Sequence, residues 1–114
     1  MAISYTFFNT HIGLSIEERE KQIQELLQVT GRKRGKTLLV GDFNAERDEI
    51  VPSVAEQFND VFPAEESILT FPASKPLSRI DYLFTSKDLS FSNASVIETL
   101  ASDHLPITVE ITMD

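Results

Sequence analysis

The first forty residues alternate between two strand patterns and one helix pattern, and this order limits the possible folds more than any other feature. Residues 3–10 alternate aromatic or β-branched residues with small polar ones, as expected of a strand. Ser15 followed by Glu18 has the form of a capping box, which opens a helix with apolar residues at helical spacing. The continuous apolar run 37–40 predicts a strand covered on both faces. A strand–helix–strand crossover joins parallel strands, so these two strands should be parallel.

The rest of the chain predicts an irregular middle followed by three strands. Gly31 should lie just beyond the first helix, at the C′ position that stops it. A short helix is expected over residues 53–58, and three prolines after it indicate a long loop. Alternating apolar residues then predict strands over 79–85, 91–98 and 107–111, joined as an up-and-down meander. We therefore expect an α/β or α+β fold, in which a mixed β-sheet has helices on one face. Residues 1–114 should belong to a single domain.

This topology gathers six polar side chains at one edge of the sheet. They are His11, Asp42, Asn44, Asp81, Asp103 and His104. The first three follow the two parallel strands, which end at the same edge. The others lie near the starts of two later strands, which should begin at that edge if they run antiparallel to the first pair. Ligand sites commonly form outside strand ends of this kind, so the sequence predicts a site here.

Each of these residues also has a purely structural interpretation. Asp42 and Asn44 follow a glycine and could be turn residues, because such side chains bond their own backbone. Asp81 could pair with the arginine two residues before it on a solvated strand face. His104 could be a surface histidine in a loop cap, and His11 could serve structure alone. Their shared placement at one edge favours a site over these separate interpretations.

Four short motifs stand in a fixed order along the chain. They are residues 9–11 (NTH), 41–44 (GDFN), 79–84 (RIDYLF) and 102–107 (SDHLPI). In these motifs the sequence resembles the C-terminal half of the endonuclease/exonuclease/phosphatase superfamily, the DNase I-like metal-dependent phosphohydrolases. The resemblance covers essentially the whole chain and implies half of a four-layer αββα sandwich.

The resemblance also implies a role for the residues at the predicted sheet edge. Asp42 would orient or deprotonate the attacking water, and Asn44 would hold that water and a phosphate oxygen. His104, held by Asp81, would bind or protonate a phosphate oxygen, and His11 would contact the phosphate. The implied reaction is hydrolysis of a phosphate ester.

The same resemblance assigns Asp103 to a divalent cation, Mg²⁺ or Mn²⁺. A phosphate ester carries negative charge that repels nucleophiles, so attack needs a cation or cationic groups around its oxygens. Magnesium prefers oxygen ligands and keeps several waters, so one or two carboxylates suffice. A cluster of carboxylates would also repel itself without a cation.

Members of this superfamily are longer, and their N-terminal half supplies a second sheet and a glutamate that binds the metal. Without that sheet, the face opposite the helix would be a large uncovered apolar surface. We therefore expect self-association, giving a homo-oligomer, or pairing with a separate N-terminal half. Without that glutamate the metal site is incomplete. The alternative to a hydrolase is thus a half-domain without turnover that acts as a folded, self-associating or partner-binding module.

Composition bears on substrate and location. The chain has 10 Lys and Arg against 18 Asp and Glu, a net charge of −8, which favours a small phosphate ester over nucleic acid without excluding the latter. No apolar run approaches the ~20 residues that cross a bilayer, and no signal peptide is visible. The chain has no cysteine, which fits a reducing compartment, and we expect a cytoplasmic protein.

Two segments outside the predicted site have open interpretations. The basic residues within 32–36 could form a solvated turn or contact a phosphate. The loop 60–76 carries Phe62 and Phe71, which could form a substrate wall or pack into the core.

Overall fold

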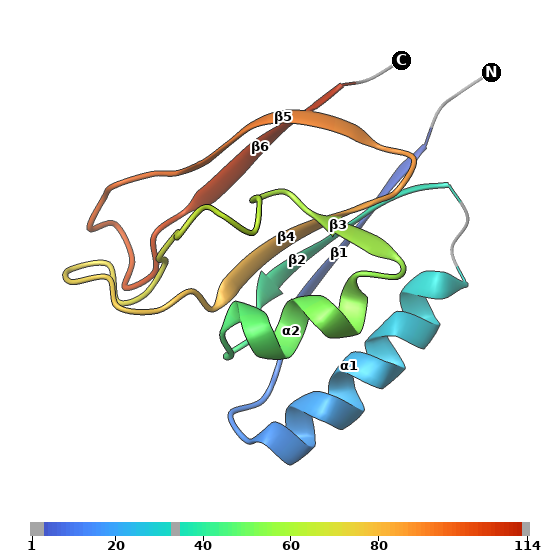
Figure 1. Cartoon of the computed structure of the whole chain (residues 1–114), viewed down its shortest axis with the longest axis horizontal. Helices are drawn as coiled ribbons and strands as arrows, with labels where there is room; N and C mark the ends of the chain where they lie inside the picture. The colour runs from blue at the N-terminus through green and yellow to red at the C-terminus, as the bar shows by residue number, and fades with distance from the viewer. Residues whose placement is uncertain (1–3, 33–34, 113–114) are drawn as a thin grey trace.

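The computed structural model describes residues 4–32 and 35–112. Its main sheet has four strands, and both helices lie on one side of it (Figure 1). Its strands, in spatial order, are β1 (Tyr5–His11), β2 (Lys36–Asp42), β4 (Asp81–Ser86) and β3 (Phe58–Asp60). The first two strands are parallel, as the crossover predicts, and β4 runs antiparallel to both β2 and β3. The sheet is therefore mixed, and its strand ends are arranged as the sequence indicates.

Helix α1 (Ile16–Gly31) makes the crossover between the two parallel strands. The backbone N–H of Glu18 donates to the Ser15 hydroxyl at 3.2 Å, and that hydroxyl donates to the Glu18 carboxylate at 3.0 Å, so the predicted N-terminal cap forms. The prediction that Gly31 lies just beyond the helix was wrong. Gly31 is the last helical residue, because Arg32 still has a right-handed helical backbone and caps the helix.

Helix α2 (Arg47–Val54) lies earlier than the helix expected over residues 53–58. Ile50 and Val54, one helical turn apart, are fully buried in the core and fix the position of this helix. Phe58 instead opens β3, where it pairs with Ser86 of β4. The helix position was therefore set by tertiary packing, which overrides the local pattern.

The last two strands do not join the main sheet, so the predicted three-stranded meander was wrong. Strands β5 (Ser90–Val96) and β6 (Ile107–Thr112) pair with each other in a separate antiparallel ribbon. This ribbon crosses the sheet on the side opposite the helices (Figure 1). Its inward residues, with Leu38 and Leu83 of the sheet, form an apolar cluster, whereas outward residues such as Glu110 are exposed. The face that we expected to be bare is thus largely packed.

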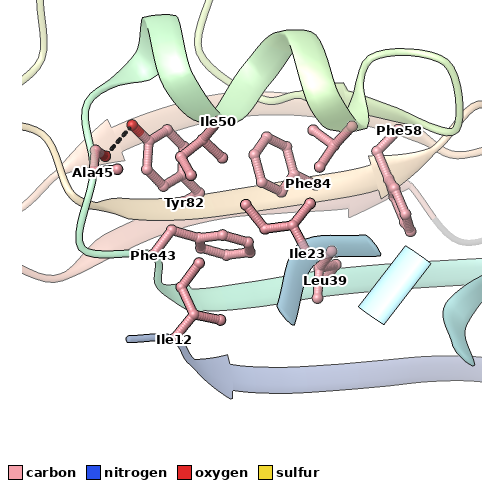
Figure 2. Packing of buried hydrophobic residues seen from close by; sticks show 10 residues of the cluster. Ile12, Ile23, Leu39, Phe43, Ala45, Ile50, Phe58, Tyr82 and Phe84 are labelled. Atoms are coloured by element: carbon pink, nitrogen blue, oxygen red, sulfur yellow. Dashed lines mark hydrogen bonds between the residues drawn. The ribbon is translucent and has the colours of Figure 1, made fainter. Parts of the chain in front are cut away.

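The core on the helix side is built around aromatic rings (Figure 2). Phe43, Tyr82 and Phe84 are fully buried, and the Phe43 ring meets the Tyr82 ring edge-on at 5.5 Å. The Tyr82 hydroxyl donates to the carbonyl oxygen of Ala45 at 2.8 Å. Burial raises the pKa of this hydroxyl, so it stays a neutral donor. These contacts fix the segment that follows β2.

Lys36, the last residue of the predicted basic turn, begins β2 and so lies at the opposite end of this strand from Asp42. Lys36 donates from its ammonium to the carbonyl oxygen of Asp88 at 3.1 Å. Lys33 and Arg34 lie outside the described residues. Neither helix of the described part has both the length and the apolar character that a membrane span requires.

Candidate active site

Three neighbouring strands bring acidic and histidine side chains to one edge of the sheet. In the strand register, His11 lies beside Asp42, and Asp42 lies opposite Asp81. Oδ2 of Asp42 is 3.4 Å from Nε2 of His11 and 3.7 Å from Nε2 of His104. The other ring nitrogen of His104, Nδ1, is 2.8 Å from Oδ2 of Asp81. Both imidazoles of the chain therefore meet the same carboxylate, as the predicted convergence requires.

The two oxygens of Asp42 have different surroundings. Oδ1 accepts the backbone N–H of Asn44 at 2.9 Å, which is the turn bond of the structural interpretation. Oδ2 faces the two histidines. Asn44 has a left-handed backbone, with φ of 51°, and its side-chain amide donates to the carbonyl oxygen of Ile12 at 2.7 Å. The turn thus holds one oxygen of Asp42 and leaves the other toward the cleft.

Thr70, which was not among the predicted site residues, connects the two segments that carry Asp81 and His104. The buried hydroxyl of Thr70 accepts the backbone N–H of Ile80, at 3.1 Å, and the Thr70 carbonyl accepts the backbone N–H of Leu105, at 2.7 Å. Thr70 therefore ties the segment before Asp81 to the segment after His104. Its place in an irregular loop gives no periodic signal that could reveal this role.

The two phenylalanines of the 60–76 loop have different environments. Phe62 is buried in the cluster beneath the β5–β6 ribbon, so it packs in the core. The Phe71 ring lies 4.7 Å from the His104 ring, centre to centre, and borders the site. The substrate-wall interpretation is therefore wrong for Phe62, and for Phe71 it stays a prediction.

Asp103 and Asn44 lie beside the central group without joining it. Asp42, Asp81 and His104 each offer a ligand atom, and these atoms lie within 4.8 Å of one another, which makes them a possible metal-binding group. The side chain of Asp103 is exposed and accepts the Ser102 hydroxyl at 3.3 Å. Its assignment to the metal stays a prediction.

Asp42, Asp81 and His104, together with His11, line an open cleft of about 590 Å³ at the sheet edge, whereas Asn44 and Asp103 are not part of its lining. Strands β1, β2 and β4 form one side, and residues 102–107 form the other. Among the residues that the structure describes, no Lys or Arg lines the cleft. The carboxylates of Asp42 and Asp81 supply hard oxygen donors to this group, which suit a hard divalent cation. The donor set therefore fits the metal that the sequence resemblance implies.

Comparison with known proteins identifies the family of this chain. A sequence model of the Endonuclease/Exonuclease/phosphatase family matches residues 5–104. The chain belongs to this family. The family includes phosphatases and nucleases, so membership alone does not select a substrate.

Individual proteins are similar to this chain in sequence or in fold. A UPF0294 protein of Yersinia enterocolitica is 29% identical over 101 residues, which cover 88% of this chain and 38% of the relative. A conserved protein of unknown function from Enterococcus faecalis V583 has a crystal structure with a TM-score of 0.77 at 25% identity. A mannosyl-6-phosphatase of Bacteroides thetaiotaomicron shares the fold, with a TM-score of 0.64 at 23% identity.

The chain spans only part of these relatives. It is covered to 95% by the Enterococcus structure and to 94% by the Bacteroides phosphatase, and it accounts for 50% and 51% of those chains. This chain, with its mixed α+β fold, therefore matches about half of the length of these two solved proteins.

The charge of His104 in this family member depends on its carboxylate neighbours. Burial by itself lowers the pKa of His104. The hydrogen bond with Asp81 and the negative charges of Asp81, Asp42 and Asp103 act in the other direction and outweigh burial. The net effect raises the pKa of His104 above its ordinary value of 6.5, which favours the protonated form of the ring.

Asp81→Asn should lower the pKa of His104, because burial then opposes a weaker attraction. We expect an NMR titration of the His104 ring, without divalent cations, to have its midpoint above 6.5 in the parent protein and clearly lower in the variant. A raised pKa stabilises the fold below the unfolded pKa, and this contribution is lost as pH rises through the folded pKa. The stability difference between the two proteins should therefore shrink over that range.

Asp103→Asn is the matched control for this titration, because Asp103 acts on His104 by charge alone and makes the smallest contribution. It should move the midpoint less than Asp81→Asn does. Equal midpoints in the parent and Asp81→Asn proteins would contradict the assigned origin of the shift.

Proposed function

We propose that this cleft hydrolyses a phosphate ester with a bound divalent cation. The observation that carries the proposal is the contact among Asp42, Asp81 and His104, which come from three separate segments of the chain. Two hydrogen-bonded or charge-paired carboxylates around a histidine at strand ends form a site for acid–base chemistry. Membership in a family of phosphatases and nucleases supports phosphate as the group that reacts.

The chain's own residues divide the work according to their contacts. Oδ2 of Asp42 faces the cleft and can accept a proton from a water molecule while Oδ1 keeps its turn bond. A protonated His104 donates from Nδ1 to Asp81, which fixes the ring and leaves the Nε2 proton for a phosphate oxygen. His11, whose side chain is 74% exposed at the cleft rim, can contact another phosphate oxygen. The side-chain amide of Asn44, next to Asp42, is proposed to contact the attacking water and a phosphate oxygen.

The cation is proposed as Mg²⁺ or Mn²⁺, held by carboxylates of the central group with Asp103 beside them. When bound, such an ion neutralises charge on the phosphate oxygens. The residues that line the cleft support a role for the cation. Among the described lining residues, only the two histidines could supply positive charge to a bound phosphate.

The lining also supports a small phosphate ester as substrate. Two buried arginines are engaged in ion pairs away from the cleft lining: Arg19 binds Glu49, and Arg79 binds Asp60. A polyanion such as nucleic acid is held chiefly by Lys and Arg contacts to many phosphates. With a net charge of −8, the chain is better suited to a single phosphate group on a small molecule.

Hydrolysis of a chromogenic phosphodiester, bis(4-nitrophenyl) phosphate, tests the proposal. We expect turnover that needs Mg²⁺ or Mn²⁺ and that falls by roughly 10²–10⁴-fold in His104→Ala, the usual contribution of acid–base groups. Ser92→Ala, an exposed change on β5 outside the cleft, is the control and should retain the parent rate. Equal turnover by parent and His104→Ala would contradict the proposal.

A second candidate is a half-domain that binds the cation without turnover. The observation that favours it is coverage of only about half of the solved relatives. In that case Mg²⁺ should raise the thermal midpoint of the parent protein and leave Asp103→Ala unchanged, with no hydrolysis by either. A parent protein that shows neither stabilisation nor hydrolysis would contradict both candidates.

A further inference from the structure

Strand β1 forms an outer edge of the main sheet. In the described part of the chain it pairs only with β2. The N–H of Ile12 donates to the carbonyl oxygen of Asp42, so even-numbered residues of this strand direct their backbone groups toward β2. Backbone direction alternates along a strand. The N–H and C=O groups of Tyr5, Phe7, Asn9 and His11 therefore point away from the sheet.

This edge lacks the features that usually prevent edge pairing. It is seven residues long, contains neither proline nor lysine, and carries Phe7, which is 64% exposed. A hollow of about 290 Å³ lies between β1 and α1, lined in part by Thr10, Leu26 and Val29, so the helix does not close over the edge near Thr10.

The other strand edges of the described structure are better protected. β3, at the opposite end of the sheet, has only three residues. β5 is irregular between Ser92 and Ser95, where Asn93 has a left-handed backbone with φ of 54°. β6 begins directly after Pro106 and carries the charged Glu110. The edge of β1 is thus the longest regular one without such protection.

We propose that two copies of this chain pair antiparallel through β1 and form a symmetric dimer with a continuous sheet. The sequence of the strand is self-complementary in one register. Tyr5 then lies opposite His11 of the second copy, and Phe7 lies opposite Asn9 of the second copy. This register matches the backbone groups of every outward residue, and no two charged side chains of like sign face each other.

The same register places aromatic residues about the twofold axis on both faces. Phe8 lies directly opposite Phe8 of the second copy, at a position where side chains approach closely. Phe7 lies diagonal to Phe7 of the second copy, within reach for aromatic rings. A second copy therefore satisfies the edge and covers the exposed Phe7, which is why we choose it over a strand from an unrelated chain.

Size-exclusion chromatography with light scattering tests the dimer. We expect the parent protein at micromolar concentration to have twice the molar mass of one chain. Phe7→Lys should halve that mass, because it removes the aromatic pair and places two ammonium groups near the twofold axis. Leu77→Lys is the matched control: Leu77 is 70% exposed in a loop, so the same change in charge there should leave the dimer intact. A monomeric parent protein would overturn the proposal.

Amide hydrogen exchange identifies the surface that pairs. In the dimer, the outward N–H groups of Phe7 and Asn9 should be protected, and Phe7→Lys should remove the protection of Asn9. Thr6 and Phe8, which face β2, should stay protected in both proteins and show that the variant is folded. A parent dimer with unprotected Phe7 and Asn9 amides would overturn the proposal, as would a dimer that persists in Phe7→Lys. Either result would point to another surface or to a strand supplied by a different chain.

Discussion

Asp60→Asn should destabilise the fold by about 3–5 kcal/mol, the usual cost of removing one member of a buried ion pair. Asp60 and Arg79 are joined by two hydrogen bonds, of 2.7 and 2.9 Å, and their side chains are only 6% and 4% exposed. The Arg79 guanidinium also lies over the ring of Tyr82, 4.3 Å from its centre. The asparagine variant keeps the shape of Asp60 but leaves the arginine charge buried without its counter-ion.

Urea unfolding followed by circular dichroism measures this loss. Glu49→Gln is the matched control, because it removes the negative member of a second Arg–carboxylate pair, Arg19–Glu49, in which Glu49 is 32% exposed to water. Arg19 is buried, but it keeps its hydrogen bond to the carbonyl oxygen of Leu14 at 2.6 Å, and water has access to the Glu49 side of the pair. The loss should therefore be smaller. A loss for Asp60→Asn no greater than that for Glu49→Gln would contradict the importance assigned to the buried pair.

Gly41→Ala should be the other severe substitution, with a loss of roughly 2–6 kcal/mol from backbone strain and overpacking together. Gly41 has φ of 151°, which disfavours any residue with a Cβ atom. A Cβ at this position would lie 1.8 Å from the carbonyl oxygen of Thr10 on the neighbouring strand. Strands β1 and β2 would have to separate where they carry His11 and Asp42.

Urea unfolding measures the stability loss, and the phosphodiester assay tests whether separation of the strands that carry His11 and Asp42 also lowers turnover. Gly35→Ala is the control for both measurements. Gly35 also has a positive φ, of 91°, but a Cβ there would meet nothing within 4 Å. The control therefore isolates strain from collision and should cost less stability than Gly41→Ala. Similar losses for the two variants would show that the contact with Thr10 is easily relieved.

Local sequence patterns predicted the elements whose boundaries depend on neighbouring residues. The Ser15 cap formed because it needs only Glu18, three residues away. The parallel pairing of β1 and β2 followed from the length of the crossover, and it placed His11 beside Asp42. The approach of Asp42 to Asp81 was also predictable from strand direction. His104 reaches the same edge from the segment before β6, which lies in the separate ribbon, so the meander that placed it there was the wrong reason for a correct position.

Features that depend on distant contacts were not predictable in this way. The Arg79 partner is Asp60, 19 residues away, whereas a local interpretation paired this arginine with the aspartate two residues on. Asp81 binds His104 instead. The β5–β6 ribbon left the main sheet because its inward apolar residues pack against Leu38 and Leu83, which alternation within one strand does not reveal. The choice among sheets was a matter of packing rather than propensity.

The divided environment of Asp42 affects how any mutagenesis of this cleft should be interpreted. Alanine at this position would remove the acceptor for the Asn44 amide along with the carboxylate, so inactivity would not distinguish lost chemistry from a collapsed turn. Asparagine can retain a carbonyl oxygen for that amide while it replaces the other oxygen with a group that cannot take up a proton. Only Asp42→Asn therefore distinguishes a loss of proton transfer from a loss of the turn structure.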